Sequence, residues 1–282
     1  MTITIKTGNT GFTDFLAYLD AFDADYTSAG RGGFSNGFSG DYASSEGGIG
    51  ETGIAADQGY IARGNLAYSL ATHVVSGTIA AIEFGHGATA NDGAGGIIDY
   101  ALSLLDYTIS FAPDLEDPEA HDVIYGLFGS GPAGEGKTDP IVDLLKTEAI
   151  VFKGSIGNDV FAGYGKADTL NGLRGSDTLK GRAGADELNG GAGRDILVGG
   201  RGADDFNFTG QFGRDIIRDF QAGRDDLDFS KLTGEATSLR EFKAAATEVN
   251  GRVIYDMDGD GANVIVLLGV SLDDLHARDF IF

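Results

Sequence analysis

The chain has 282 residues, which is enough for two domains, and its 43 acidic against 20 basic residues give a formal net charge of −23 at pH 7. Such an acidic surface repels nucleic acid and anionic membranes, whereas it suits divalent cations. The sequence has no cysteine, which excludes disulfides and thiolate metal sites, and its N-terminus, "MTITIKTGNT", lacks the basic start and apolar run of a signal peptide.

Residues 1–150 hold 21 of the acidic and 5 of the basic residues and form the first predicted domain. The hydrophobic pattern predicts, in chain order, a strand at 2–6, a helix at 12–22, a long Gly-, Ser- and Asp-rich loop at 28–60, strands at 60–70, 73–85 and 106–112, and helices at 120–129 and 139–150. Mixed elements of this kind predict an α+β fold, with an antiparallel sheet and helices packed on one of its faces.

Tyr68 and His73 lie where two of these predicted strands meet. On one strand their odd spacing would place them on opposite faces, and on a helix they would lie about 140° apart. A bend at Ala71-Thr72 would let the phenol and the imidazole meet. On the residues alone, however, the favoured interpretation is that Tyr68 is a half-buried strand residue and His73 a turn residue.

The blocks "GNLAYSL", His73 and "GTIAAIEFG", together with "HDVIYGLFGSG", resemble the HasA-type haemophores, which are secreted proteins that capture haem. The resemblance implies that the phenolate of Tyr68 binds the iron of ferric haem b, while His73 accepts the phenol's hydrogen bond and steadies it. It also implies that Leu70 and Phe128 form pocket walls. The stretch "DADYTSAGRGGF" has no histidine for a second axial position, and Tyr26 is the nearest candidate ligand there.

The same resemblance implies a non-enzymatic role in haem and iron acquisition. The partners that it implies are haem, a bacterial outer-membrane haem receptor and host haemoproteins. Protonation of His73 would weaken the iron bond and would give a release switch.

Two other motifs favour other functions. "GFSNG" (Gly33–Gly37) satisfies the nucleophile elbow G-x-S-x-G, which needs a strand before it and a helix after it, but Ser35 has loop-like composition on both sides. A secreted lipase or esterase using Ser35 therefore stays as an alternative, beside a non-catalytic adhesin-like module. "GPAGEGKT" (Gly131–Thr138) satisfies the P-loop expression, but Pro140 would interrupt the helix that a phosphate needs, so a loop before a helix is predicted there.

Residues 154–207 form six blocks of nine: GSIGNDVFA, GYGKADTLN, GLRGSDTLK, GRAGADELN, GGAGRDILV and GGRGADDFN. The sixth place is always aspartate: Asp159, Asp168, Asp177, Asp186, Asp195 and Asp204. The eighth is always large and apolar: Phe161, Leu170, Leu179, Leu188, Leu197 and Phe206. This period predicts a solenoid whose aspartates bind Ca²⁺ together with backbone carbonyls, and whose first- and fourth-place glycines supply positive φ. Lys166 replaces one fourth-place glycine, which predicts a weaker site in that block.

These blocks resemble RTX repeats, the calcium β-roll of proteins exported by type I secretion. The following "GADDFNFTGQFGRDIIRDFQAGRDDLDFSKL" resembles the β-sandwich extension of serralysin-type tails, and the final "LLGVSLDDLHARDFIF" resembles the uncleaved export signal. The resemblance implies an all-β second half, with a parallel roll at 151–208 and the extension and signal at 209–282. It further implies export through the type I secretion machinery and folding outside the cell, where calcium is abundant.

The stretch "DMDGDGANVIVLL" starts like an EF-hand loop, with aspartates at Asp256, Asp258 and Asp260. Its twelfth place is Leu267, where an EF-hand requires a bidentate glutamate. Apolar, strand-like residues flank it on both sides, so a β-hairpin turn is predicted there.

Overall fold

The computed structural model describes residues 1–8, 14–25, 33–36, 39–45, 58–69, 74–92, 98–116, 118–128, 138–232 and 238–282. The chain forms two compact units. The first comprises Met1–Thr10 and Phe15–Glu148, and the second comprises Gly11–Asp14 and Ala149–Phe282. The chain is mostly β, and no helix within the described ranges is long and apolar enough to cross a membrane.

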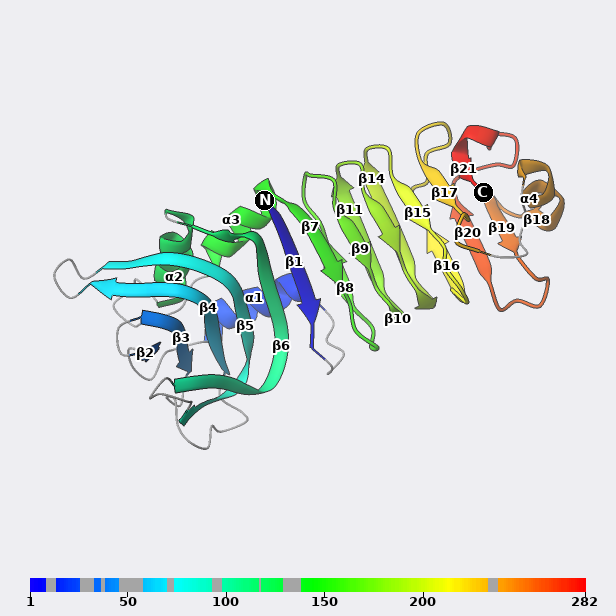
Figure 1. Ribbon diagram of the computed structural model, residues 1–282. Coiled ribbons are helices and arrows are strands. Elements are labelled where there is room, and N and C mark those ends of the chain that lie inside the picture. The colour runs from blue at the N-terminus through cyan, green and yellow to red at the C-terminus, as the bar shows by residue number, and fades with distance from the viewer. Residues whose placement is uncertain are drawn as a thin grey trace. The chain divides into compact units, whose positions relative to one another are not determined.

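An antiparallel sheet is the centre of the first unit (Figure 1). In the described part of this unit its strand order is β2-β3-β4-β5-β6-β1. The strands are β1 (Thr2–Thr7), β2 (Gly33–Asn36), β3 (Ser39–Ser45), β4 (Gln58–Ser69), β5 (Val74–Asp92) and β6 (Ile98–Leu115). β5 and β6 extend beyond the predicted 73–85 and 106–112 because they stay paired with each other as far as Asp92 and Ile98.

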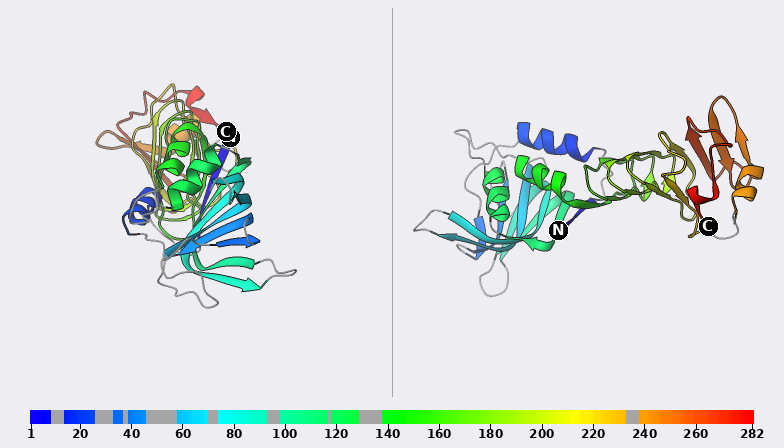
Figure 2. Two further views of the ribbon diagram at one scale, coloured as in Figure 1. Left: turned by 90° about the vertical axis from the view of Figure 1, so that its left-hand side faces the viewer. Right: turned by 90° about the horizontal axis from the view of Figure 1, so that it is seen from above.

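The helices α1 (Phe15–Asp25), α2 (Glu119–Phe128) and α3 (Asp139–Thr147) lie on one side of this sheet (Figure 2). α1 buries the apolar stripe that its spacing predicts, and two of its aromatic residues contact the sheet directly. The ring centroids of Phe15 and Tyr107 are 5.0 Å apart, and those of Phe22 and Phe84 are 5.1 Å apart. Aromatic packing between α1 and the sheet therefore forms much of the core of this unit.

The predicted loop at 28–60 contains a hairpin, so this prediction is wrong in part. β2 and β3 pair with each other, and β3 pairs in turn with β4, where Tyr42 lies opposite Ala62. Tyr42 and Ala43 are buried. Glycine and serine give this stretch a loop-like composition, and it is pairing with β4 that makes it a strand, which local sequence does not show.

The second unit is a roll in which successive nine-residue blocks contribute strands alternately to two parallel sheets (Figure 1). We name these sheet A and sheet B. Sheet A of this unit contains, in order, β7 (Ala149–Lys153), β9 (Thr169–Asn171), β12 (Glu187–Asn189), β15 (Asp205–Asn207), β17 (Asp226–Asp228) and β21 (Phe280–Ile281). Sheet B contains β8 (Val160–Ala162), β11 (Thr178–Ala183), β14 (Ile196–Arg201), β16 (Arg214–Ile217), β20 (Val264–Leu268), β19 (Arg252–Asp256) and β18 (Ala246–Glu248).

The interior of the roll is formed by the eighth-place side chains, which point inward from both sheets. All six that the repeat predicts are buried. The roll begins with two stacked rings, Phe152 of β7 and Phe161 of β8, whose centroids are 4.1 Å apart. Short paired strands β10 (Arg174–Gly175) and β13 (Ala192–Gly193) lie in the turns between the sheets.

The C-terminal region continues the same two sheets. β16 and β20 extend sheet B, and β17 and β21 extend sheet A, all in parallel pairing, while β18, β19 and β20 pair antiparallel. An aromatic cluster closes this end, where α4 (Leu239–Ala245) places Phe242 at 4.4 Å from the Tyr255 ring and 4.8 Å from the Phe280 ring. The predicted β-sandwich extension is thus built from strands that belong to the sheets of the roll.

Candidate functional sites

The six repeat aspartates are buried, each at most 1% exposed, and form two ladders along the roll. In each ladder the backbone N–H of one aspartate donates to Oδ1 of the aspartate eighteen residues later. The N···O distances are 2.7 Å from Asp159 to Asp177, 2.8 Å from Asp168 to Asp186 and 2.8 Å from Asp177 to Asp195. One oxygen of each carboxylate therefore fixes the previous turn of the chain.

The second oxygen of most of these carboxylates has no protein partner. Oδ2 is buried without a hydrogen bond in Asp177, Asp186, Asp195 and Asp204. It lies beside the first-place glycine of its own block, so that a β-carbon on Gly172 would overlap Oδ2 of Asp177. The carbonyl oxygen of Gly190, from the next turn, would overlap the same β-carbon and therefore lies near this carboxylate oxygen. A buried carboxylate oxygen beside a carbonyl oxygen fits a hard cation such as Ca²⁺.

At each such position, the oxygen atoms that a Ca²⁺ ion would meet come from one carboxylate and from main-chain carbonyls. Within the described ranges, no group of three or more His, Asp or Glu side chains is placed to hold a metal ion. Bound Ca²⁺ would compensate the negative charge of the buried carboxylates.

The glycines of the repeat have different roles from those predicted. Positive φ occurs at the second and fourth places, as in Leu173 (74°) and Gly175 (132°), rather than at the first and fourth. The first-place glycines are required for space beside the carboxylate instead. Lys166 and the equivalent Gly157 of the first block both lack a positive φ, so the backbone of this turn accepts a lysine.

Burial raises the pKa of the ladder carboxyls above the ordinary 3.8. It raises the pKa of Asp177 to about 7, and repulsion from Asp195 and Asp159 adds to it, while a backbone hydrogen bond opposes it. Burial likewise raises the pKa of Asp186 to about 7. In the metal-free roll these carboxyls are therefore partly protonated at neutral pH, and a cation would have to displace protons.

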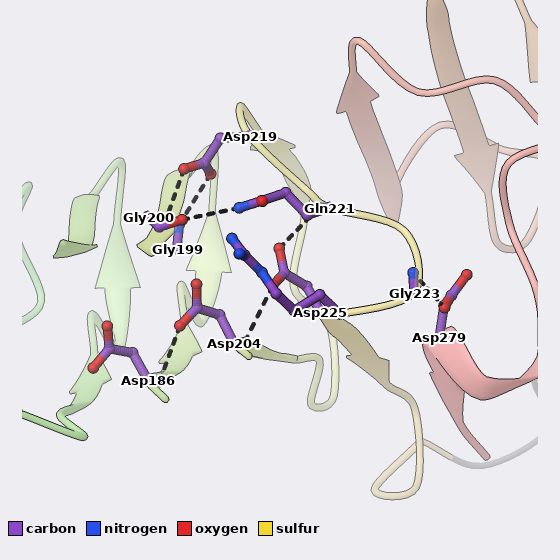
Figure 3. Close-up of polar contacts among 10 residues, drawn as sticks. Asp186, Gly199, Gly200, Asp204, Asp219, Gln221, Gly223, Asp225 and Asp279 are labelled. Atoms are coloured by element: carbon purple, nitrogen blue, oxygen red, sulfur yellow. Dashed lines mark hydrogen bonds and ion pairs between the residues drawn. The ribbon is translucent and has the colours of Figure 1, made fainter. Parts of the chain in front are cut away.

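The ladders continue through two degenerate blocks that the repeat analysis missed. Residues 210–218 (GQFGRDIIR) and 220–228 (FQAGRDDLD) keep aspartate at the sixth place and an apolar residue at the eighth. The N–H of Asp195 donates to Oδ1 of Asp215 at 3.1 Å. The N–H of Asp204 donates to Oδ1 of Asp225 at 3.3 Å, as Figure 3 shows. Insertions at 208–209 and 219 break the nine-residue phase, which hid these blocks. Aligning only the sixth and eighth places would have found them.

The roll ends where side chains replace the backbone contacts of earlier turns (Figure 3). The inserted Asp219 accepts hydrogen bonds from the N–H groups of Gly199 at 3.0 Å and Gly200 at 2.9 Å. Beyond it, the buried Asp279 accepts from the N–H of Gly223 at 2.8 Å and from that of His276 at 2.7 Å. Carboxylates thus satisfy the backbone donors at the last turn.

In the first unit, Tyr68 lies near the end of β4. The backbone of β4 pairs with β5 so that Tyr68 lies opposite Val75 and Ser69 opposite Val74. The bend predicted at Ala71-Thr72 lies outside the described residues. His73, Leu70 and Tyr26 lie outside the described residues, as do the side chains of Tyr68 and of Phe128, the last residue of α2.

Two glycines, one in β4 and one in β5, allow these two strands to approach closely. The pairing of β4 and β5 shifts register between Arg63 and Gly64. A β-carbon on Gly64 would overlap the carbonyl of Thr78, and one on Gly77, whose φ is 122°, would overlap that of Asn65. The glycine of "GNLAYSL" is thus required for close approach of the two strands.

Of the two competing motifs, the one around Ser35 lacks the context that its chemistry needs. Ser35 lies within β2, which pairs with β3 in a hairpin, whereas a nucleophile elbow continues into a helix. Residues 131–137 of the P-loop expression lie outside the described residues, and Thr138 is the N-cap of α3. Pro140 lies in the first turn of α3, where its missing N–H is tolerated, so the expected interruption of the helix is wrong.

The predicted turn after Asp256 is confirmed as the hairpin between β19 and β20. The carboxylates stabilise the turn itself. Asp256 Oδ1 accepts from the N–H of Gly259 at 3.0 Å, and Asp258 Oδ2 accepts from the amide of Asn263 at 3.1 Å.

Comparisons with known proteins agree with the repeat assignment. Residues 153–186 and 171–206 match the RTX calcium-binding nonapeptide repeat. Among solved structures, the chain is similar to the AlgE6R3 subunit of the Azotobacter vinelandii mannuronan C5-epimerase, at 31% identity over 46% of this chain and 81% of that one, with a TM-score of 0.38. A comparison with curated protein sequences gives no match.

Two further solved structures are similar at lower identity. They are the apo hemophore HasA from Yersinia pestis (22% identity, 51% of this chain, 88% of that chain, TM-score 0.38) and the extracellular lipase LipA from Serratia marcescens (20%, 82%, 30%, 0.42). By the match to the family model alone, residues 153–206 of this chain are RTX calcium-binding nonapeptide repeats.

Proposed function

We propose that this protein is a secreted haem-binding protein whose RTX roll folds on extracellular calcium. The N-terminal unit would bind ferric haem through Tyr68, with His73 as the supporting base. This proposal rests on the resemblance of "GNLAYSL", His73 and "GTIAAIEFG" to haemophores, and on one structural observation, the β4–β5 hairpin.

The register of that hairpin carries the proposal. Because Ser69 pairs with Val74, residues 70–73 join the ends of the two paired strands, and Tyr68 lies at that end of β4. This register is compatible with the proposed contact between the two side chains, which an uninterrupted strand or helix would not allow. A phenol and an imidazole so close along the backbone are the donor set that a tyrosinate-ligated haem requires.

The chemistry of these residues follows from their ordinary ionisation. A free tyrosine ionises near pH 10, so binding iron at neutral pH requires a group that takes its proton. A neutral imidazole at position 73 would accept that hydrogen bond and orient the phenol ring. Haem supplies the ferric centre that the phenolate binds. Protonation of the imidazole at acidic pH would remove this support and favour release.

Hemin titration of the calcium-refolded protein tests this function. We expect a tyrosinate-type ferric absorption spectrum that is lost in Tyr68→Phe and that weakens, with a steeper pH dependence, in His73→Ala. Tyr60→Phe is the matched control, because Tyr60 lies in the same strand away from the turn and should leave the spectrum unchanged. An unaltered spectrum in Tyr68→Phe would refute the proposed ligand.

The main alternative is a serine hydrolase that uses Ser35. Esterase activity measured on the same preparation, and lost in Ser35→Ala, would favour it over haem binding. The position of Ser35 inside a β-hairpin argues against this alternative, because the elbow depends on a strand-turn-helix geometry to expose the nucleophile.

The calcium ligands that we propose are the six repeat aspartates, with Asp215 and Asp225 continuing the two ladders. Asp186→Asn should raise the calcium concentration needed for half-maximal folding by about tenfold, because one charged ligand is lost. Glu187→Gln is the matched control, since Glu187 is its exposed neighbour on the outer face. Equal calcium midpoints for the two variants, measured by circular dichroism, would exclude Asp186 as a ligand.

The proposed location and partners follow from the same function. An RTX protein exported by the type I machinery would meet haem outside the cell, where it could take it from host haemoproteins and deliver it to an outer-membrane receptor. Secretion of the intact chain, measured with and without a co-expressed type I exporter, tests this part of the proposal separately.

A further inference from the structure

The two sheets of the roll present outer faces of opposite character. Along each strand the eighth-place residue points inward, so the seventh- and ninth-place residues point outward. Parallel pairing aligns equal places of successive turns, so each place forms a row along the roll with about 4.8 Å between neighbours. Each face therefore presents one seventh-place and one ninth-place side chain per turn of the roll.

The outer face of sheet B is apolar and basic. Its seventh-place row consists of half-buried Val160, Thr178, Ile196 and Ile216, which are paired in register. In the ninth-place row Lys180 pairs with Val198, and Arg218 follows on the next strand, directly after Ile217. Lys180 and Arg218 are both exposed.

The outer face of sheet A is acidic and polar. Its seventh-place row contains Glu187, Asp205 and Asp226 on successive strands, each paired with the next. Its ninth-place row adds Asn189, Asn207 and Asp228. Like charges placed side by side on neighbouring strands repel one another, so a cationic surface placed against this face would reduce that repulsion.

We propose that the sheet A face of one molecule docks on the sheet B face of a second copy of this chain. In the ninth-place row of sheet B, Lys180 and Arg218 lie two turns apart, with Val198 between them. In the acidic row of sheet A, Glu187 and Asp226 also lie two turns apart, so the spacing of the charges matches. Carboxylates of one copy can therefore meet Lys180 and Arg218 of the other without adjustment of register. The apolar row of sheet B is covered in the same contact.

The contact joins two different surfaces and is therefore heterologous. Such contacts add further copies in one direction unless rotation closes a ring, so the expected product is a short linear array. Pairing two sheet B faces would instead oppose Lys180 and Arg218 to like charges. The rows exist only in the folded roll, so self-association requires calcium. This inference does not depend on haem binding.

Sedimentation velocity with charge-reversed variants tests the docking. Variant B carries Lys180→Glu and Arg218→Glu, and variant A carries Asp205→Lys and Asp226→Lys. In calcium, the wild type should associate as concentration rises and dissociate at high salt, and each variant alone should associate about tenfold or more weakly. An equimolar mixture of the two variants should associate again, because the unaltered sheet A face of variant B can dock on the unaltered sheet B face of variant A.

Arg174→Glu with Arg194→Glu is the control, because it makes the same change in net charge at turn residues outside the sheet B face. It should associate like the wild type, and circular dichroism should show calcium-dependent folding in every variant. A wild type that stays monomeric throughout, or a mixture that does not recover association, would overturn the proposal. So would a monomer that binds an anionic polymer or anionic vesicles through Lys180 and Arg218, which would assign the basic face to that partner.

Discussion

In each block of the roll, the first-place glycine leaves the space that the side chain of the sixth-place aspartate occupies. The sequence alone identified both, because they recur every nine residues. It gave the wrong reason for the glycine, since backbone conformation and side-chain space both favour glycine and only coordinates separate them. The left-handed Leu173, with φ of 74°, could not be predicted, because its conformation is imposed by the stacked turn and not by its own preference.

Two glycines of one block should respond oppositely to substitution. A β-carbon at Gly163 would overlap Oδ2 of Asp168, whereas at Gly165 nothing lies within 4 Å. We expect Gly163→Ala to lower the free energy of unfolding in calcium by about 1–3 kcal/mol and to weaken calcium binding. Gly165→Ala should be neutral or slightly stabilising. Urea denaturation monitored by circular dichroism compares them, and equal midpoints would contradict the proposed packing.

Helices and strands were predicted correctly where the local hydrophobic pattern determines the element. They were missed where pairing with a distant strand determines it. The amphipathic stripe of α1 and the alternation of β1 were readable from sequence. β2 and β3 were not, because their Gly- and Ser-rich strands are held by β4. Likewise, β16 and β17 belong to the roll although insertions disrupt its period. The candidate haem ligand Tyr68 was placed on its hairpin by backbone register, and its function still rests on resemblance.

The closure of the roll by Asp279 gives an element-scale prediction. Asp279 is 1% exposed and accepts hydrogen bonds from two backbone N–H groups. Asp279→Ala leaves both donors without this partner, so the free energy of unfolding in calcium should fall by about 2–3 kcal/mol. Asp273→Ala, at an exposed residue nearby, is the control. If the two variants show the same loss in urea denaturation, Asp279 does not hold the end of the roll.

For the whole molecule, the acidic composition and the calcium roll are linked through protonation. With 43 acidic residues, much of the charge is solvated, but the ladder carboxyls are buried. Their pKa values are raised, so the folded metal-free roll binds protons that the unfolded chain releases. Protons and calcium therefore stabilise the same carboxylates by different means.

The stability of the calcium-free roll should depend on pH through these carboxyls. For Asp177 and Asp186 the ordinary pKa is 3.8 and the folded pKa is about 7, so the calcium-free roll loses stability as pH rises through this window. We expect the folded fraction of the calcium-free roll, measured by circular dichroism, to increase when pH is lowered from neutral to about 5, while apparent calcium affinity decreases. The double variant Asp177→Asn/Asp186→Asn should flatten this dependence, which separates the ladder from general charge repulsion. A folded fraction of the wild type that does not depend on pH would contradict the assignment.

The eighteen-residue spacing of the aspartate ladders constrains how the length of this protein can change. A hydrogen bond always connects an aspartate to the one two blocks later, within the same sheet. Removing one block would shift every later strand to the opposite sheet and pair acidic outer rows with apolar ones. Removing two adjacent blocks would return each strand to its own sheet. Natural or engineered variants of this roll should therefore gain or lose repeats in pairs.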